Sequence, residues 1–360
     1  MSEPLRFGVI GTGLMGVEHI QNLALQDDAK LVALSDPVER SRGWGRRAAG
    51  WDVPAYESAV EMIERHDPDA LIIASPNHTH AEVLEPLWRF GKHFLVEKPL
   101  CTSLDDCRSV ATRAQQHPGV FWVGMEYRYM PPIARLIDEV HDGDVLGRLH
   151  MLAIREHRFP FLPKVGDWNR FNRNSGGTLV EKCCHFFDLM RLIVRAEPVR
   201  VYASAGQSVN HLDETYDGET PDIWDNGLVT VDFDNGVRAL LDLCMFAEAS
   251  RYQEEITATG DRGKVECFLP KANDAECLLT LGKRESGEVR SEPIEVDAAL
   301  LEAGHHHGST YFQQAAFARA ARGDDEVAVT VDDGLRAVAV GVAAQISAQE
   351  HRVVPMSEVL

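Results

Sequence analysis

Apolar residues in the first third of the chain gather in short blocks, and longer amphipathic stretches separate these blocks. One block, Leu31-Val32-Ala33-Leu34, is apolar throughout, which is typical of a parallel strand buried on both faces. Repeated strand–helix units of this length predict a parallel sheet with helices on both faces. The expected strands are residues 6–10, 30–35, 70–74, 93–96 and 120–124, and the expected helices are 14–26, 37–49, 58–65, 81–90 and 104–116.

The pattern changes after about Gly147, where alternating apolar and polar positions replace the uniformly apolar blocks. Residues 228–233 and 237–244 alternate on either side of Asp234-Asn235-Gly236, which predicts a β-hairpin. Long antiparallel strands with one apolar face favour an open sheet whose other face meets helices, solvent or another subunit. Further strands are expected at 147–157, 263–268 and 276–281, helices at 132–142, 178–194, 311–321 and 332–349, and a polar loop at 206–225.

Three glycines follow the first expected strand with the spacing G-x-G-x-x-G. Gly11 would allow a tight turn, Gly13 would let the backbone approach a pyrophosphate, and Gly16 would let the helix pack close to the strand. Free N–H groups at the helix start would then face the phosphates. The alternative is a doubly wound domain whose glycine turn binds no nucleotide. The segment predicted to bind a dinucleotide is Gly11, Thr12, Gly13, Leu14, Met15 and Gly16.

Asp36 follows the second expected strand, where an acidic side chain can bind both ribose hydroxyls of the adenosine. Its negative charge would repel a 2′-phosphate, so the residue favours NAD as the cofactor. Four arginines come soon after it and leave NADP open: Arg40, Arg42, Arg46 and Arg47.

The chain of 360 residues is long for one core and suggests two domains. We predict an α/β protein with an N-terminal Rossmann domain, a doubly wound parallel sheet, at residues 1–125. The remaining residues, 126–360, are predicted to form a C-terminal α/β domain with a large open, mostly antiparallel sheet. This second domain would bind the substrate and form the contacts between subunits.

The composition narrows the classes of partner. A formal charge of −20 argues against nucleic-acid binding through a general basic surface. No stretch approaches about 18 uninterrupted apolar residues and no secretory signal is visible, so we expect a cytoplasmic protein without a membrane partner. Seven scattered cysteines without a C-x-x-C pair favour free thiols. Cys183, Cys184 and His185 are consecutive and would point in different directions on a helix, so no metal site is predicted.

Two polar clusters follow the third and fourth expected strands, at the edge where parallel sheets bind ligands. Ser75, Asn77 and His80 could meet a ribose or a nicotinamide, although such residues also cap a helix. Glu97-Lys98-Pro99 follows the fourth strand, and the proline fixes the direction of the lysine. A surface lysine is the alternative there.

A third cluster lies in the expected helix 178–194. On a helix Glu181 and His185 share a face, because they are four residues apart, and Asp188 lies near it. A carboxylate beside an imidazole raises the imidazole pKa and can fix its tautomer. This arrangement suits a general base that accepts a hydroxyl proton during oxidation. The alternative is an ordinary polar pair at a helix start.

These motifs, in this order, resemble the Gfo/Idh/MocA oxidoreductases, NAD(P)-dependent sugar and polyol dehydrogenases and their relatives. The resemblance runs over nearly the whole chain and includes Thr259-Gly260 and Gly263 in the second half. It implies that Lys98 and His185 line the substrate. The family's aspartate position holds Glu181, which keeps the charge and adds a methylene.

The resemblance also implies further contacts. Arg128 would lie near the cofactor crevice, together with Glu97 and Lys98. The segment Trp168, Asn169 and Arg170 resembles a substrate-side loop, and the tryptophan could instead pin this loop to the core. His306 and His307 correspond to a segment that reaches sugar hydroxyls, or they belong to a polar loop.

Together these features predict reversible hydride transfer between a secondary alcohol of a sugar, sugar derivative or cyclitol and a nicotinamide. His185 would take the hydroxyl proton with help from Glu181, and Lys98 would bind the same oxygen. A relative that cleaves or isomerises glycosides through transient oxidation is one alternative, and a non-catalytic dinucleotide sensor is another. By resemblance we expect a homodimer or homotetramer.

Overall fold

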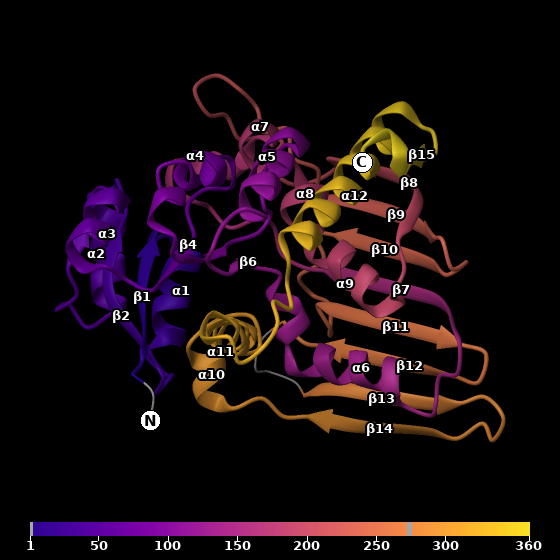
Figure 1. Ribbon diagram of the computed structural model, residues 1–360. Coiled ribbons are helices and arrows are strands. Elements are labelled where there is room, and N and C mark those ends of the chain that lie inside the picture. Colours follow the sequence, from indigo (N-terminus) through magenta and orange to yellow (C-terminus); the bar gives the residue numbers. More distant parts are fainter. Residues whose placement is uncertain (1–2, 272–275) are drawn as a thin grey trace.

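The computed structural model describes residues 3–271 and 276–360, and the chain in it forms two sheets (Figure 1). The first sheet has six strands in the order β3-β2-β1-β4-β5-β6, and all its neighbours are parallel. Its order reverses direction beside β1, which places a ligand crevice at the carboxyl ends of β1 and β4. The strands are β1 (Leu5–Ile10), β2 (Ala29–Ser35), β3 (Ala55–Tyr56), β4 (Ala70–Ile73), β5 (His93–Val96) and β6 (Phe121–Val123).

Helices connect these strands as the predicted strand–helix units require. They are α1 (Leu14–Leu23), α2 (Glu39–Ala48), α3 (Ala59–His66), α4 (His80–Leu84) and α5 (Leu104–Ala114). The helix expected over 81–90 was wrong in its length, because α4 ends at Leu84 and a separate 3-10 turn covers Trp88–Phe90. Another 3-10 turn, η1 (Asn77–Thr79), precedes α4.

The second sheet has nine strands in the order β14-β13-β12-β11-β7-β10-β9-β8-β15. Only the β7–β10 pair is parallel among these described strands, so the prediction of a mostly antiparallel sheet is confirmed. The strands are β7 (Leu149–His157), β8 (Pro198–Gly206), β9 (Asn226–Phe233), β10 (Arg238–Cys244), β11 (Glu254–Gly260), β12 (Gly263–Leu269), β13 (Cys277–Lys283), β14 (Val289–Ile294) and β15 (Val354–Pro355).

Sequence reasoning missed four of these strands, and one of them, β15, has only two residues. β11 has the sequence EEITATG and β14 has VRSEPI, so neither carries enough apolar residues to predict a strand. β14 lies at an edge of the sheet and is largely exposed, where polar residues are tolerated. β8 does alternate, with Val201 and Ala203 buried, and its pattern was overlooked.

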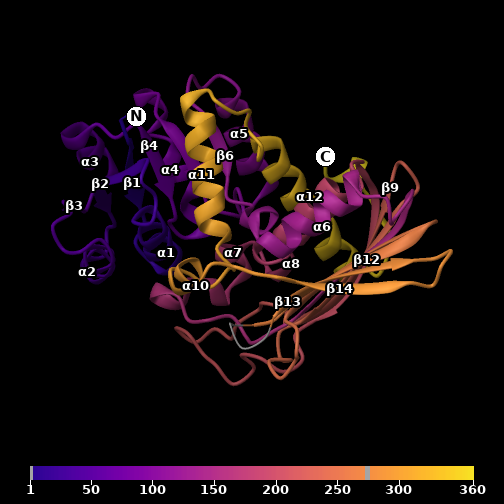
Figure 2. The ribbon, with the colours of Figure 1, turned by 90° about the horizontal axis from the view of Figure 1, so that it is seen from below.

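Helices cover one face of the second sheet, and α6 and α12 lie on the same side of it (Figure 2). The helices of this half are α6 (Pro131–Asp142), α7 (Asn172–Ser175), α8 (Thr178–Glu181), α9 (Cys184–Val194), α10 (Ala298–Glu302), α11 (Ser309–Arg322) and α12 (Val331–Glu350). Three more 3-10 turns are η3 (Glu126–Tyr129), η4 (Val165–Arg170) and η5 (Met356–Glu358). Among the described residues, no helix is long and apolar enough to cross a membrane.

The single helix expected over 178–194 was wrong, because α8 ends at Glu181 and α9 begins at Cys184. Lys182 and Cys183 lie between the two helices. The segment is buried nearly throughout, so tertiary packing rather than helical periodicity sets its path.

The core of the first sheet includes residues from the far end of the sequence. Phe317 of α11 lies between Phe7 and Trp122, with ring centroids 6.0 and 6.1 Å away, and Val338 of α12 is buried in the same core. The two C-terminal helices therefore help to fix the first sheet against the second. The division at residue 125 stays a prediction.

Candidate active site

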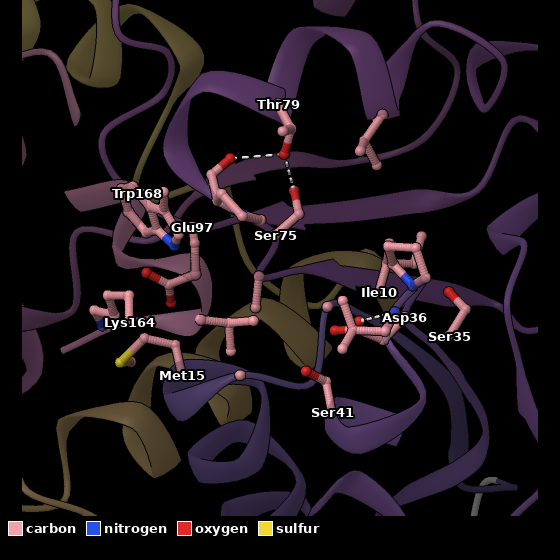
Figure 3. Close-up of a pocket in the computed structure, with 18 of the residues that line it drawn as sticks. Ile10, Met15, Ser35, Asp36, Ser41, Ser75, Thr79, Glu97, Lys164 and Trp168 are labelled. Atoms are coloured by element: carbon pink, nitrogen blue, oxygen red, sulfur yellow. Dashed lines mark hydrogen bonds between the residues drawn. The ribbon is translucent and has the colours of Figure 1, made fainter. Parts of the chain in front are cut away.

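A cleft of about 930 Å³ runs along the carboxyl edge of the first sheet. In Figure 3, Ser35 and Asp36 lie on one side of the view, and Glu97, Lys164 and Trp168 lie on the other. The lining therefore joins the glycine turn to the segments that follow β5, the 163–168 loop and α8.

The glycine turn has the backbone that the motif requires. Gly11 has a φ of +87°, and a Cβ there would lie 2.6 Å from the backbone of Ala74 and Ser75. At Gly16 a Cβ would lie 1.9 Å from the carbonyl oxygen of Gly11. Gly13 is different, because a Cβ there would meet nothing within 4 Å. Two glycines thus allow close packing, and the third leaves open space on the cleft side of the turn.

The first turn of α1 fits a phosphate group. Gly13 is the N-cap of this helix, and no side chain caps its N–H groups. The amide groups of a helix start bind anions well, since they carry hydrogen-bond donors and the positive end of the helix dipole. Gly13, Leu14 and Met15 line the cleft, whereas Thr12 is buried behind it.

Asp36 is held rigidly at the far end of the cleft. The N–H of Thr12 donates to its Oδ2 at 2.8 Å, and the N–H of Val38 donates to its Oδ1 at 2.8 Å. The side chain of Arg42 donates to the carbonyl oxygen of Asp36 at 2.7 Å, so it faces the backbone of this turn. Arg40 lines the cleft nearby. A fixed carboxylate at this position fits the two hydroxyls of an adenosine ribose.

Glu97 and Lys98 reach the other end of the cleft from the end of β5. The Oε1 of Glu97 pairs with Nε2 of the buried His19 at 2.7 Å, and its Oε2 accepts the N–H of Lys98. Burial would raise the pKa of Glu97, yet the hydrogen bond and charge of His19 and the charge of Lys98 lower it. The carboxylate is therefore ionised and fixes the backbone from which Lys98 projects.

The ammonium group of Lys98 has no ion-pair partner within 4.0 Å among the described residues. Burial would lower its pKa, but the acidic groups nearby, Cys184 first and then Glu97 and Glu181, raise it. A charged lysine in a cleft without a partner is available to a ligand oxygen.

Glu181 and His185 lie beside Lys98, although not as a helical pair. Burial raises the pKa of Glu181, and its Oε2 has no hydrogen-bond partner. Burial, followed by the charge of Lys98, lowers the pKa of His185 well below its usual value, and its Nδ1 is also unpartnered. The expectation that Glu181 raises the pKa of His185 was wrong, because burial and the charges of nearby cations lower this pKa.

Tyr127 fixes the ring plane of His185. The two rings are stacked, with centroids 4.0 Å apart and planes 11° apart. The hydroxyl of Tyr127 accepts a hydrogen bond of 2.5 Å from Lys182, which also forms a buried ion pair with Glu156 at 2.8 Å. The segment between α8 and α9 thus anchors the stacking partner of the imidazole.

Besides Thr12 and Gly16 of the glycine turn, two residues predicted to bind the cofactor lie away from the cleft lining. The imidazole of His80 is fully buried among the carbonyl groups of Ser75, Pro99 and Leu100, and burial lowers its pKa. Arg128 forms a bidentate ion pair with Asp188, with Nε 2.6 Å from Oδ2. Ser75 and Asn77 do line the cleft.

Of the three predicted substrate residues in this loop, one lines the cleft and two do not. Trp168 lines the cleft, 6.1 Å from the ring of His78. Asn169 donates to the carbonyl of Leu162, and Arg170 is buried against Glu214, so both hold the loop in place.

The two histidines predicted to contact the substrate, His306 and His307, have different partners. His307 is buried, 3.8 Å from the thiol of Cys277, and its Nε2 lies 3.2 Å from the carbonyl of Pro270. His306 pairs with Glu18 of α1 at 2.9 Å. Neither histidine lines the cleft itself.

Sequence reasoning missed Lys164, which lines the reaction end of the cleft. Burial lowers the pKa of Lys164. The charge of Glu181 opposes this shift, and the charge of Lys98 adds to it. It also missed Tyr127, Lys182 and Glu156. Only Lys164 carried a usable signal, since it precedes the Trp168 segment by four residues.

Two family models match the chain. The model described as the NAD-binding Rossmann fold of the Gfo/Idh/MocA oxidoreductase family matches residues 5–125, and that of its C-terminal alpha/beta domain matches residues 141–356.

Curated relatives match over nearly the full length. The chain is 28% identical to myo-inositol 2-dehydrogenase of Thermotoga maritima, over 99% of this chain and 100% of the relative. It is 26% identical to inositol 2-dehydrogenase of Rhizobium meliloti, over 97% and 98% of the two chains. The crystal structure of a "probable dehydrogenase" of Thermotoga maritima superposes with a TM-score of 0.80 at 27% identity, covering 99% of this chain and 100% of that one.

Proposed function

The chain belongs to the Gfo/Idh/MocA oxidoreductase family, and from this premise we propose that it transfers hydride between a secondary alcohol of a sugar, sugar derivative or cyclitol and NAD. The observation that carries the proposal is a group of three side chains at one end of the cleft, where Lys98 and Glu181 line it and His185 is buried next to them. Lys98 has no ion-pair partner within 4.0 Å among the described residues, and Glu181 Oε2 and His185 Nδ1 have no hydrogen-bond partner. Buried polar atoms that lack partners are costly in a folded protein, and a bound hydroxyl group would satisfy them.

Lys98 would bind the hydroxyl oxygen of the substrate. Its positive charge favours the developing alkoxide more than the neutral alcohol, so its stabilisation is greatest in the transition state. Glu97 supports this role because it accepts the N–H of Lys98 and is itself held by His19.

His185 would accept the hydroxyl proton. Burial and the charge of Lys98 keep the pKa of its imidazole well below the usual value, so the ring is neutral at pH 7 and has a free lone pair. Stacking on Tyr127 restricts the ring to one plane. Glu181 would orient the substrate hydroxyl beside Lys98 and the imidazole.

The nicotinamide supplies hydride acceptance and return when it is bound. The residues proposed to hold the dinucleotide are the glycine turn, Asp36, Ser75 and Asn77. Asp36 favours NAD over NADP, because its carboxylate is fixed by two backbone N–H groups and cannot turn away from a 2′-phosphate. The names of the inositol dehydrogenase relatives support a cyclitol as the first substrate to test.

The test is the absorbance at 340 nm with NAD and, separately, NADP across inositols, aldoses, deoxy sugars and glycosides. We expect a substrate-dependent rise with NAD. If no compound gives a rise and the purified protein carries NAD, the enzyme uses transient oxidation, and glycoside cleavage becomes the next assay. No rise and no bound or exchangeable dinucleotide would contradict the proposal.

A further inference from the structure

Three side chains from distant parts of the sequence meet in one cluster outside the cleft lining. Glu18 comes from α1, Glu126 from η3 and His306 from the segment before α11. One ligand atom from each side chain lies within 4.8 Å of the other two. The imidazole Nδ1 is 2.9 Å from Glu18 and 3.6 Å from Glu126. None of the three lines the cleft.

Glu126 gives an independent reason to expect a ligand here. Its side chain is 1% exposed, and its Oε2 accepts hydrogen bonds from Thr310 at 2.8 Å and Ser309 at 3.4 Å. Its Oε1 faces His306 and has no hydrogen-bond partner. A buried carboxylate oxygen without a donor is among the costlier groups to leave unsatisfied.

Without an ion the cluster holds its own protons: burial would lower the pKa of His306, but the charges of Glu126 and Glu18 raise it to about 9, and burial raises the pKa of Glu126. A bound cation would displace these protons. Two carboxylates surround one imidazole, so the three ligands carry a charge of −2 when Glu126 is ionised and His306 is neutral. A proton on His306 compensates half of this charge and leaves Glu126 Oε1 at 3.6 Å, beyond a hydrogen bond. A divalent cation would compensate all of it and would contact all three ligand atoms.

We propose that Glu18, Glu126 and His306 bind one divalent transition-metal ion. Two carboxylate oxygens and one imidazole nitrogen are a donor set that suits Zn²⁺ and its neighbours, while Mg²⁺ and Ca²⁺ prefer oxygen alone. Thr310 supports the site, because its hydroxyl lies 3.1 Å from Glu18 Oε1 and 2.8 Å from Glu126 Oε2 and orients both carboxylates. The His306 side chain is 25% exposed, which gives an ion a path from solvent.

The position of the site predicts its effect. It joins α1 of the first sheet's layer to η3 and to the segment that leads into α11, so a bound ion would cross-link elements from both halves of the chain. An ion that binds the folded chain and not the unfolded chain raises the melting temperature, and the rise grows with the logarithm of the free ion concentration. The prediction of no metal site followed from consecutive residues in one helix, and residues this far apart in sequence give no spacing signal.

The test is Zn²⁺ binding to the full chain after treatment with a chelator, measured by competition with a chromogenic indicator. We expect one equivalent to bind and affinity to fall at least tenfold in Glu126→Gln and in His306→Gln. The control His150→Gln, which removes an exposed histidine from β7, should leave the affinity unchanged. The melting temperature should rise with Zn²⁺ in the wild type and in the control only.

Two results would overturn the proposal. One is the absence of stoichiometric binding, in which case the cluster holds only a shared proton. The other is binding that none of the cluster variants weakens, which means an adventitious ion at other histidines. If Glu126→Gln does not fold, Glu18→Gln and His306→Gln apply the same criterion. The measurement involves no turnover, so it is independent of the proposed dehydrogenase activity.

Discussion

The two ends of the cleft are built in opposite ways. At the Asp36 end, one backbone N–H group holds each carboxylate oxygen and leaves room for a ribose hydroxyl, and Gly11 and Gly16 fix the turn through contacts that a single Cβ would destroy. At the Lys98 end, charged and polar atoms lie close together and several lack partners. A site that binds the same ligand in every catalytic cycle can be fixed in its binding geometry before the ligand arrives. A site that performs chemistry keeps polar groups available for the reacting atoms.

Removing Lys98 should have the largest effect, because it should impair the reaction and leave NAD binding at the Asp36 end intact. We expect Lys98→Ala to lower kcat about a thousandfold, or about 4 kcal/mol, because the charge that stabilises the alkoxide is lost. The affinity for NAD should change little, since the Asp36 end is untouched. Steady-state kinetics and fluorescence titration with NAD measure both, with the exposed Lys30→Ala as control. Loss of NAD binding with normal folding would show that Lys98 serves the cofactor instead.

The buried charges around Glu156 and Lys182 also predict a pH dependence of stability. Burial, followed by the charge of Glu156, raises the pKa of Glu254 to about 7 from a reference value of 4.5. A raised carboxyl pKa stabilises the fold fully below about pH 4.5, and this contribution is lost as the pH rises through about 7. Glu254→Gln should therefore gain stability relative to the wild type by up to about 3 kcal/mol between pH 4.5 and 8.

Urea unfolding at several pH values measures this difference. The exposed Glu288→Gln should show no such trend. A constant difference across the pH range would mean that Glu254 is ionised throughout and is compensated by Lys182, which lies in the same buried group.

Substitutions of Asp36 should change the preference between NAD and NADP, because they remove a negative charge at this end of the cleft. Asp36→Ala should shift the ratio of kcat/KM for NAD to that for NADP about ten- to a hundredfold toward NADP, because repulsion of the 2′-phosphate is removed and Arg40 lines the same region. Asp36→Asn removes the charge and keeps the size of the side chain. If both variants keep the wild-type preference, the residue does not select the cofactor.

Gly13→Ala gives the smallest and most selective effect. A Cβ at position 13 meets nothing within 4 Å, so the free energy of unfolding should stay within about 1 kcal/mol of wild type. NAD affinity should still fall about tenfold, since the methyl group would occupy space left for the phosphates. Calorimetry of folding and of binding tests both statements. The matched change Gly11→Ala should instead destabilise the fold, because of its φ of +87° and the contact with Ala74.

The same contrast explains which features could be predicted from the sequence. The glycine turn, Asp36 and Lys98 each follow a strand closely, so local sequence places them at the carboxyl edge of the sheet. The alternation of residues 228–244 likewise predicts β9 and β10, because register and burial share a period of two residues.

The reaction end depends on contacts that no local pattern records. His185 could be placed near Lys98 only by resemblance, and its pKa depends on burial and on Lys98 from another element. Arg128 meets Asp188 sixty residues later, and Glu18 meets His306 from the other end of the chain. Such pairs follow from the packing of α11 and α12 on the first sheet, which sequence periodicity cannot show.

Transfer of a labelled hydride tests the central claim most directly. The protein would be incubated with NAD and myo-inositol deuterated at its ring carbons, and then with deuterated sugars of the same panel, and the nicotinamide would be analysed by mass spectrometry. The account predicts that one deuterium appears in the reduced nicotinamide with at least one of these alcohols, and that Lys98→Ala slows the transfer about a thousandfold. Consumption of a substrate without any label reaching the dinucleotide would contradict it.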